Sequence, residues 1–500
     1  MKKISLYILA TIAIAAGLTS CSKDFLDRAP KLQQTTEIQL GTYDGLDAAT
    51  LGAYYYLGST GWYTQARVVD NEMRAGNGMK QAFKNSGRCL TPMVWNYTAD
   101  ATNTTMWAYC YYTVAMANNV MDNLDGKADG VTVTDQDLNN LKAECLFLRA
   151  FAHFENVLVF GQPYTYVKAN EAALTAKNDG STLGVPYIFH TDPSGKPARE
   201  TVMQTYDYIV ADLLEAESII DPAYSRSGVA DKLGTVNLQT IQALLCRVYL
   251  YMGEWQKSAD YATKVINSGK FKMWTAAEWP DVWGADLGSG EVIFEVYGKI
   301  SNGTNGSWED ISYLCKPDGY GDPVATPGLL ALYTDATDVR LTKGFITDAK
   351  AESGYWWTNK YPGKGDRDPN DVNNVIILRL SEMYLNRAEA LMHGATIAGV
   401  NGIDDLNMIP SNRGASTYTV LSQTNIELER RKELCWEGNY LNDLARWNKG
   451  VNRTAADFEL GTINQNVEFP SYRWALPIPK RELEVNPNLV PNPGYSNTNN

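Results

Sequence analysis

Histidine is scarce in this chain of 500 residues, and the cysteines are not spaced for metal binding. The three histidines are scattered, and no two cysteines form a C-x-x-C pair. Zinc sites in proteins combine closely spaced cysteine and histidine ligands. We therefore expect no metal site and no cofactor. The histidines are His153, His190 and His393, and the cysteines are Cys21, Cys89, Cys110, Cys145, Cys246, Cys315 and Cys435.

Common catalytic motifs are also missing. The chain has no G-x-S-x-G, no H-E-x-x-H and no glycine-rich loop typical of phosphate binding. We therefore assign no catalytic residue. Paired carboxylates for glycoside hydrolysis remain an alternative, because the 57 Asp and Glu residues offer many pairs.

Basic residues are in the minority, with 44 Lys and Arg against 57 Asp and Glu and a net charge of −13. Nucleic acids and anionic membranes are bound by basic patches. The composition therefore argues against both as partners and favours a neutral or cationic ligand.

Long hydrophobic runs are absent except at the N-terminus. Lys2 and Lys3 precede an apolar run from Ile4 to Gly17, which is too short to span a bilayer comfortably. Residues 1–20 are typical of a signal peptide. Leu18-Thr19-Ser20-Cys21 has the form of a lipobox, so we expect lipid attachment at Cys21. A plain secretory cleavage site is the alternative.

Helical periodicity dominates the rest of the chain. It predicts a helical scaffold over residues 44–58, 105–161, 201–268 and 376–450. Within it, the apolar stripe that starts at Leu238 is followed by a Gly253-Glu254-Trp255 turn and a returning helix with small alanines. Such a pair resembles a tetratricopeptide-type hairpin.

Two stretches lack this periodicity, residues 62–103 and 271–374. They are rich in Gly, Asn, Asp, Trp and Tyr, with one predicted strand from Glu291 to Tyr297. Long irregular segments inside a folded protein are usually functional or disordered, and the many aromatic residues argue against disorder. We therefore expect a mostly α-helical fold with a loop-rich ligand-binding face and little β structure.

The stretch from Ile426 to Gly450 has an unusual charged face. Thr424 to Glu427 reads as a capping box, and the helix is expected to run to Gly438. If its acidic face packs inward, the carboxylates need cationic partners. We interpret this as a structural ion-pair network rather than a catalytic site. The acids are Glu429, Glu433 and Glu437, and the candidate cations are Arg379, Arg387, Arg413 and Arg446.

Four motifs resemble the SusD/RagB family of outer-membrane nutrient-binding lipoproteins, and they follow one another along the chain in the family's order. They are E-R-R-x-E-L-x-x-E-G with D-L-x-R-W (Glu429 to Trp447), the helix motif from Leu378 to Ala390, P-I-P…N-P…N-P-G-Y (Pro477 to Tyr495), and the segment after Cys21. The resemblance covers both ends of the chain.

This resemblance implies one SusD-like domain over residues 21–500, lipid-anchored in the outer membrane and facing the cell exterior. It implies binding of a glycan and its delivery to a SusC-like TonB-dependent transporter. A surface glycoside hydrolase and a helical-repeat module that docks peptides or proteins are the alternatives.

Aromatic rings exposed on rigid loops would suit a glycan, because sugar C–H faces stack on them. The opposing interpretation is that large aromatics only anchor long loops to the core. The resemblance favours Trp95 most, with Asp70 and Asn96 nearby. The other candidates are Trp283, Trp308, Tyr320, Tyr355, Trp356 and Trp357.

Two further features stay open. The acidic loop Asp366 to Asp371 could suggest calcium, but it lacks the glycine and final glutamate of an EF-hand, so a solvated loop is the default. Cys89 and Cys315 are the only pair we consider for a disulfide, although buried free thiols are favoured.

Overall fold

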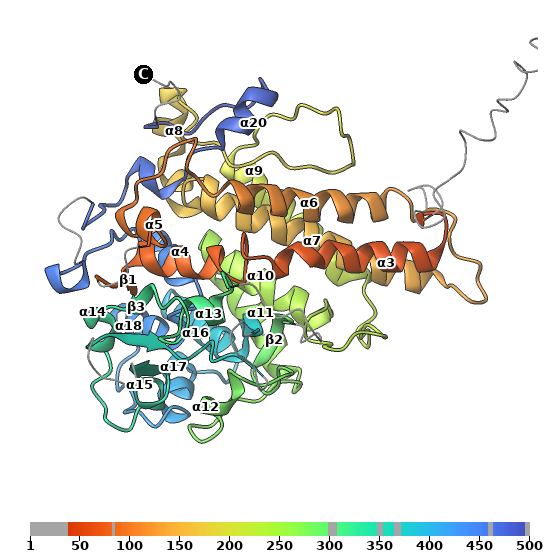
Figure 1. Ribbon diagram of the computed structural model, residues 1–500. Helices are drawn as coiled ribbons and strands as arrows, with labels where there is room; N and C mark the ends of the chain where they lie inside the picture. The colour runs from red at the N-terminus through yellow and green to blue at the C-terminus, as the bar shows by residue number, and fades with distance from the viewer. Residues whose placement is uncertain are drawn as a thin grey trace, which may run out of the picture.

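The computed structural model describes residues 39–82, 86–298, 308–347, 354–364, 372–458 and 464–495 (Figure 1). The predicted signal peptide, Cys21 and the acidic loop Asp366 to Asp371 lie outside these residues. The fold is mostly helical, as expected.

Four long helices lie side by side in the upper half of Figure 1. The longest, α7, lies at the centre of this layer and packs against the other three. Its N-terminus has a capping box in which Thr134 accepts the N–H of Asp137 and Asp137 accepts that of Thr134. All four agree with the predicted scaffold. They are α3 (Tyr43–Tyr54), α6 (Thr104–Met121), α7 (Asp135–Phe160) and α9 (Val202–Ile219).

A helical hairpin continues this layer. Helices α10 (Leu238–Met252) and α11 (Trp255–Asn267) are joined at Gly253, whose φ of +72° is easily adopted only by glycine. Helix α16 (Leu380–Met392) packs on α11, and α17 (Gly402–Ser411) packs on α16. The hairpin is confirmed, and its tetratricopeptide character stays a prediction.

Three short antiparallel strand pairs lie among the loops. The strand predicted from Glu291 to Tyr297 is confirmed as β2. Its partner β6 was expected to be the start of a helix, and that expectation is wrong. The apolar run before Arg379 is buried on β2, and the helix begins only at Leu380. The pairs are β1 (Gly78–Lys80) with β3 (Pro323–Ala325), β2 (Val292–Val296) with β6 (Val375–Arg379), and β4 (Phe345–Thr347) with β5 (Trp356–Thr358).

The other elements are short, except for α8 and α18. They are η2 (Tyr55–Gly58), α4 (Ala66–Ala75), α5 (Leu90–Val94), α8 (Tyr164–Lys177), α12 (Trp279–Val282), α13 (Ile311–Leu314), α14 (Pro327–Leu330), α15 (Val339–Thr342), α18 (Gln423–Leu434), α19 (Tyr440–Arg446), η3 (Ala455–Asp457), η4 (Tyr472–Trp474) and α20 (Lys480–Val485). The sequence pattern did not predict α8.

Helix α4 corrects the expectation that residues 62–103 are irregular. Half of its residues are polar or charged, yet nearly every side chain is buried. Arg67 forms an ion pair with Glu155 of α7 and donates to the carbonyl of Gly438. Glu72 accepts the N–H of Gly438 at 2.8 Å. Because distant partners pair with these polar groups, a helix whose polar face is buried as well as its apolar face is stable in the interior.

Both predicted ends of the charged helix α18 need correction. Ser422, rather than Thr424, is the N-cap, and its hydroxyl accepts the N–H of Asn425. The helix ends at Leu434 instead of continuing to Gly438. There the Lys360 ammonium donates to the carbonyls of Glu433 and Cys435 at 2.7 and 2.8 Å, which satisfies carbonyl groups at the helix end.

The predicted ion-pair network is confirmed on this helix. Glu433 is fully buried and accepts from Arg340, Arg379 and Arg413 at 3.0, 2.6 and 2.8 Å. Glu437 accepts from Arg379 at 2.8 Å in the same buried cluster. The three arginines come from α15, the end of β6 and the segment after α17. The network therefore joins the loop-rich segment to the helical scaffold.

Two predicted partners of the network behave differently. Arg446 pairs with Glu389 at 2.7 Å rather than with the acids of α18. Arg387 pairs with Asp405 at 2.7 Å and so lies outside the network. The expectation that both would neutralise the acids of α18 is wrong, because acids on α16 and α17 lie closer to them.

The six cysteines in the described part of the chain are free and buried. Cys89 and Cys315 therefore form no disulfide, and the alternative of buried thiols is confirmed. Burial raises the pKa of both thiols.

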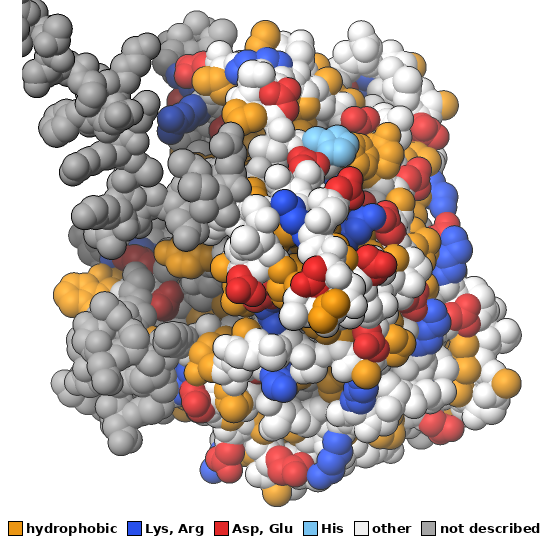
Figure 2. Space-filling model, turned by 90° about the vertical axis from the view of Figure 1, so that its right-hand side faces the viewer, with side chains coloured by type: hydrophobic (Ala, Val, Ile, Leu, Met, Phe, Trp, Pro, Cys, Tyr) orange, Lys and Arg blue, Asp and Glu red, His pale blue; other side chains and the backbone are white. Residues whose placement is uncertain are grey.

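Surface charges are interspersed rather than gathered in one field on the face shown in Figure 2. That face is the end of the molecule at which α3 begins. Within the described ranges, no helix is long and apolar enough to cross a membrane.

Replacing Glu433 should strongly destabilise the protein. Glu433→Ala leaves three buried arginines short of a counter-charge, which is expected to lower the free energy of unfolding by roughly 3–5 kcal/mol in urea titrations. The matched control is Glu427→Ala on the same helix, because Glu427 pairs with the half-exposed Lys449. That change should cost less than about 1 kcal/mol. Equal effects of the two changes would contradict burial of the network.

Acid should weaken the same network. The neighbouring arginines lower the pKa of Glu433 below its ordinary value of 4.5 and, with Lys360, that of Glu437. Such groups stabilise the fold above pH 4.5, and this contribution is lost as the pH falls through the folded-state pKa. The stability difference between wild type and Glu433→Gln, measured by urea unfolding, should therefore be largest near neutrality and shrink below pH 4.5. A difference independent of pH would show that Glu433 does not titrate this way.

Candidate functional site

The predicted aromatic candidates divide by exposure. Trp308 and Trp356 are 52% and 37% exposed, and Tyr320 is half-buried. Trp95, Trp283 and Trp357 are at most 4% exposed. Only the first group can offer a ring face to a ligand.

Trp308 and Tyr320 are brought together through Tyr313. The Trp308 and Tyr313 rings stack with centroids 6.4 Å apart, and Tyr313 meets Tyr320 edge-to-face at 5.1 Å. We call these three residues the aromatic row. Ring pairs in these geometries support one another, so the row is partly pre-formed.

An arginine–glutamate pair borders the row. The Arg88 guanidinium lies 3.6 Å from the centroid of the Tyr320 ring. It also donates to both carboxylate oxygens of Glu309, at distances from 2.7 to 3.2 Å. Both side chains are partly exposed, at 30% and 41%. The pair is polar with almost no net charge, and it lies next to the apolar ring of Tyr320.

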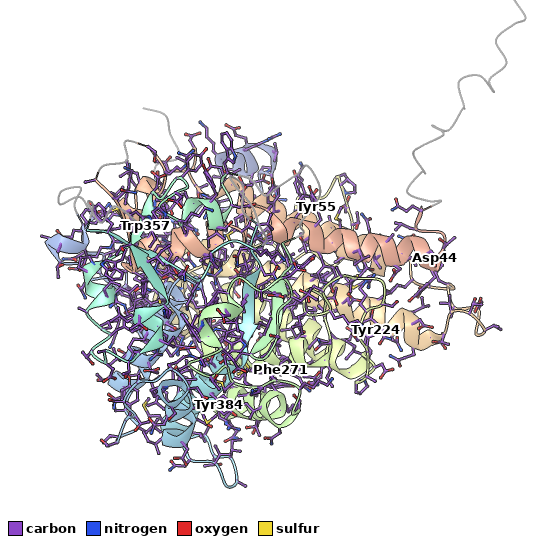
Figure 3. The ribbon with its side chains drawn as sticks, turned by 60° about the horizontal axis from the view of Figure 1, so that its bottom comes forward. Asp44, Tyr55, Tyr224, Phe271, Trp357 and Tyr384 are labelled. Carbon is purple, nitrogen blue, oxygen red and sulfur yellow. The ribbon has the colours of Figure 1, made fainter. Side chains whose placement is uncertain are left out.

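Buried groups hold the segment that carries the row. The N–H of Ile311 donates to the Thr64 carbonyl at 2.7 Å, and the N–H of Tyr320 donates to the Tyr313 carbonyl at 3.0 Å. The carbonyl of Gly321 accepts the Trp357 indole N–H at 3.0 Å. Figure 3 shows Trp357 on β5, far from Asp44 at the other end of the molecule. Trp357 thus anchors the loop, and its predicted exposure is wrong.

Trp95 is also an anchor rather than an open platform. Its indole N–H donates to the Arg74 carbonyl at 3.1 Å, and the Arg74 guanidinium lies 4.3 Å from its ring centroid. Trp474 packs edge-on against it at 5.3 Å. Trp283 is likewise covered by Trp274 and Trp279. The expectation that these rings are exposed is wrong, because neighbours already occupy their faces.

Comparison with known proteins decides the family. Residues 24–250 match a family model described as "Starch-binding associating with outer membrane", and residues 346–495 match that of the SusD family. A crystal structure of a SusD superfamily protein from Bacteroides thetaiotaomicron is 30% identical, with a TM-score of 0.78 over 90% of this chain and 100% of its own. The chain belongs to the SusD/RagB family.

Two curated relatives support the assignment. SusD-like protein P2 of Formosa agariphila is 26% identical to this SusD/RagB chain, over 99% of the chain and 100% of the relative. Starch-binding protein SusD of Bacteroides thetaiotaomicron is 24% identical, over 98% of both chains. The resemblance inferred from the motifs is thereby confirmed.

Asp70 and Asn96 group with Trp95 rather than with the aromatic row of this SusD/RagB protein. Asp70 is half-buried on α4, and burial raises its pKa to about 6 although Asn103 and Arg74 act in the opposite direction. Asn96 is exposed directly after the buried Trp95. Binding of a ligand by either residue stays a prediction.

Three members of the site were not predicted: Arg88, Glu309 and Tyr313. Glu309 and Tyr313 follow Trp308 closely in sequence, so their proximity could have indicated them. Arg88 lies more than 200 residues earlier, next to no motif, and only the fold brings it to Tyr320. In the described part of this SusD/RagB chain, no group of three or more His, Cys, Asp or Glu side chains is placed to hold a metal ion.

Replacing Trp95 should mainly lower the stability of the fold rather than act directly on ligand binding. Trp95→Ala removes a fully buried indole, which is expected to lower the free energy of unfolding by about 3–5 kcal/mol in urea titrations. Asn96→Ala, at the exposed neighbour, is the control and should change stability by less than about 0.5 kcal/mol. A Trp95→Ala protein of wild-type stability would contradict this packing.

Proposed function

We propose that this chain binds a neutral glycan on the aromatic row. The observation that carries the proposal is the partly pre-formed set of the exposed Trp308 and the half-buried Tyr313 and Tyr320 beside the Arg88–Glu309 pair. One relative that matches nearly the full chain is named a starch-binding protein, which supports a carbohydrate as the ligand class.

The chemistry of the row suits a sugar. The C–H face of a pyranose ring is apolar and can stack on an indole or phenol ring, while its hydroxyls both donate and accept hydrogen bonds. The phenol of Tyr320 and the carboxylate and guanidinium groups beside it provide partners of both kinds. Because Arg88 and Glu309 neutralise each other, the row favours an uncharged ligand.

The cellular role follows from the family by analogy. We infer that the chain is lipid-anchored at Cys21 on the outer membrane, faces the cell exterior and delivers its glycan to a SusC-like TonB-dependent transporter. Support comes from the lipobox sequence and from a matching family model whose description names association with the outer membrane. The proposed action is capture without cleavage.

Removing the rings should weaken glycan binding stepwise. Each ring contributes on the order of 0.5–1.5 kcal/mol beyond its buried area, so Trp308→Ala or Tyr320→Ala should lower affinity for a neutral oligosaccharide about threefold to tenfold. Calorimetric titration of the mature chain with maltohexaose, and with hexasaccharides of other neutral glycans, measures this. The double variant should lose detectable binding.

Tyr472→Ala is the control, because Tyr472 is an exposed aromatic (37%) on the C-terminal segment. It should bind as the wild type does. Full binding by the double variant would contradict the site. Shortened products after overnight incubation, abolished by replacing one loop carboxylate, would indicate a glycoside hydrolase instead.

A further inference from the structure

We propose that four surface tyrosines form a second carbohydrate-binding platform, so that the natural ligand is a long neutral polysaccharide that lies on both platforms. The four are Tyr55, Tyr56, Tyr109 and Tyr112, which we call the tyrosine cluster. The inference rests on the proposed function of the aromatic row and extends it from a short oligosaccharide to a polymer.

The tyrosine cluster is an exposed aromatic surface with a defined geometry. Tyr56 lies at its centre, with ring centroids 5.3, 5.1 and 5.2 Å from those of Tyr55, Tyr109 and Tyr112. Tyr55 is 75% exposed and Tyr112 is 50% exposed, while the other two are half-buried. The inner rings thus support the outer ones, which leaves ring faces and edges open to a ligand.

Rigid elements hold the cluster in place. Tyr55 and Tyr56 lie on η2, directly after α3, and Tyr109 and Tyr112 lie three residues apart on one face of α6. Helix α6 packs against both α3 and η2. Below the cluster, Leu57 and Cys110 belong to the main core. A platform on packed helices loses little conformational entropy when a ligand binds.

Charge is absent from the chain around the cluster. Residues 48–66 and 101–121 contain no Asp, Glu, Lys or Arg. In the described part of the chain, the four phenol hydroxyls make no hydrogen bond to protein groups, so they are available to ligand hydroxyls or water. Open rings and hydroxyls on chain segments without charged residues match a neutral sugar better than a charged ligand.

A hollow lies beside chain segments that carry parts of the tyrosine cluster and of the aromatic row. Gly58, at the end of η2, forms its wall together with Tyr297, Asn373 and the segment Asp310 to Ser312, and its volume is about 170 Å³. Asp310 to Ser312 lies between Trp308 and Tyr313 of the aromatic row. The proposed path of an extended glycan runs from the tyrosine cluster past this hollow to the aromatic row.

Two platforms on one polymer act by effective concentration. Once one platform holds the chain, the second binding event is intramolecular, which raises the overall affinity without any new contact. A hexasaccharide that occupies only the aromatic row gains nothing from the tyrosine cluster. The cluster should therefore matter for polymers and not for short oligosaccharides.

The test compares polymer with oligomer on the same array. The mature chain and its variants are titrated over immobilised neutral polysaccharides, starch among them, printed beside their own hexasaccharides. Tyr55→Ala/Tyr112→Ala should weaken polymer binding about tenfold and change hexasaccharide binding by less than about twofold. Trp308→Ala/Tyr320→Ala should lose both. Leu214→Ala, which removes an exposed side chain (40%) on α9, is the matched control and should change neither.

Three outcomes would overturn the second platform. Unchanged polymer binding by the tyrosine variant shows that the cluster holds no glycan. Equal losses for polymer and hexasaccharide show that the tyrosines belong to a single site. Normal glycan binding together with loss of a copurifying outer-membrane protein shows that the cluster is a protein interface. A wild-type chain that binds no glycan on the array contradicts the proposed function itself. Circular dichroism of each variant confirms that it is folded.

Discussion

The burial of the Glu433 carboxylate is the constraint on which most of this structure depends. A buried charge without partners is very costly, and Glu433 meets this requirement with three arginines from separate parts of the chain. Arg379 also binds Glu437, and Arg413 also binds Glu291 beside β2. Long irregular segments with few regular hydrogen bonds are thereby held to α18 in one arrangement. The aromatic row lies on one of these segments.

Elements with an apolar stripe could be predicted from the sequence alone. Helix α7 buries Leu141, Cys145, Leu148 and Ala152 at helical spacing, and the Gly253 turn marked the α10–α11 hairpin. Helix α4 was missed because half of its residues are polar or charged, and the partners of Arg67 and Glu72, which are Glu155 and Gly438, lie far away in sequence. Strand β6 was missed for a related reason, since only pairing with β2 distinguishes its apolar run from the start of a helix.

For the candidate site, the sequence indicated the residue types and the loop but not the exposure of each ring. Trp308 and Trp357 are both tryptophans of the segment 271–374, yet one is open and the other is buried. Trp357 packs in the main core and donates its N–H to the Gly321 carbonyl, whereas Trp308 stacks on Tyr313 and stays exposed. Family motifs gave the correct fold while directing attention to Trp95, whose faces Arg74 and Trp474 cover. Exposure depends on tertiary contacts that no local pattern contains.

The contact between α4 and Gly438 also has a consequence for biogenesis. Arg67 and its acceptor, the Gly438 carbonyl, are 371 residues apart. A ribosome releases the chain from the N-terminus, so α4 lacks this partner until almost the whole polypeptide has emerged. The contact between α4 and Gly438 therefore forms late, although the residues of α4 are among the first to be made.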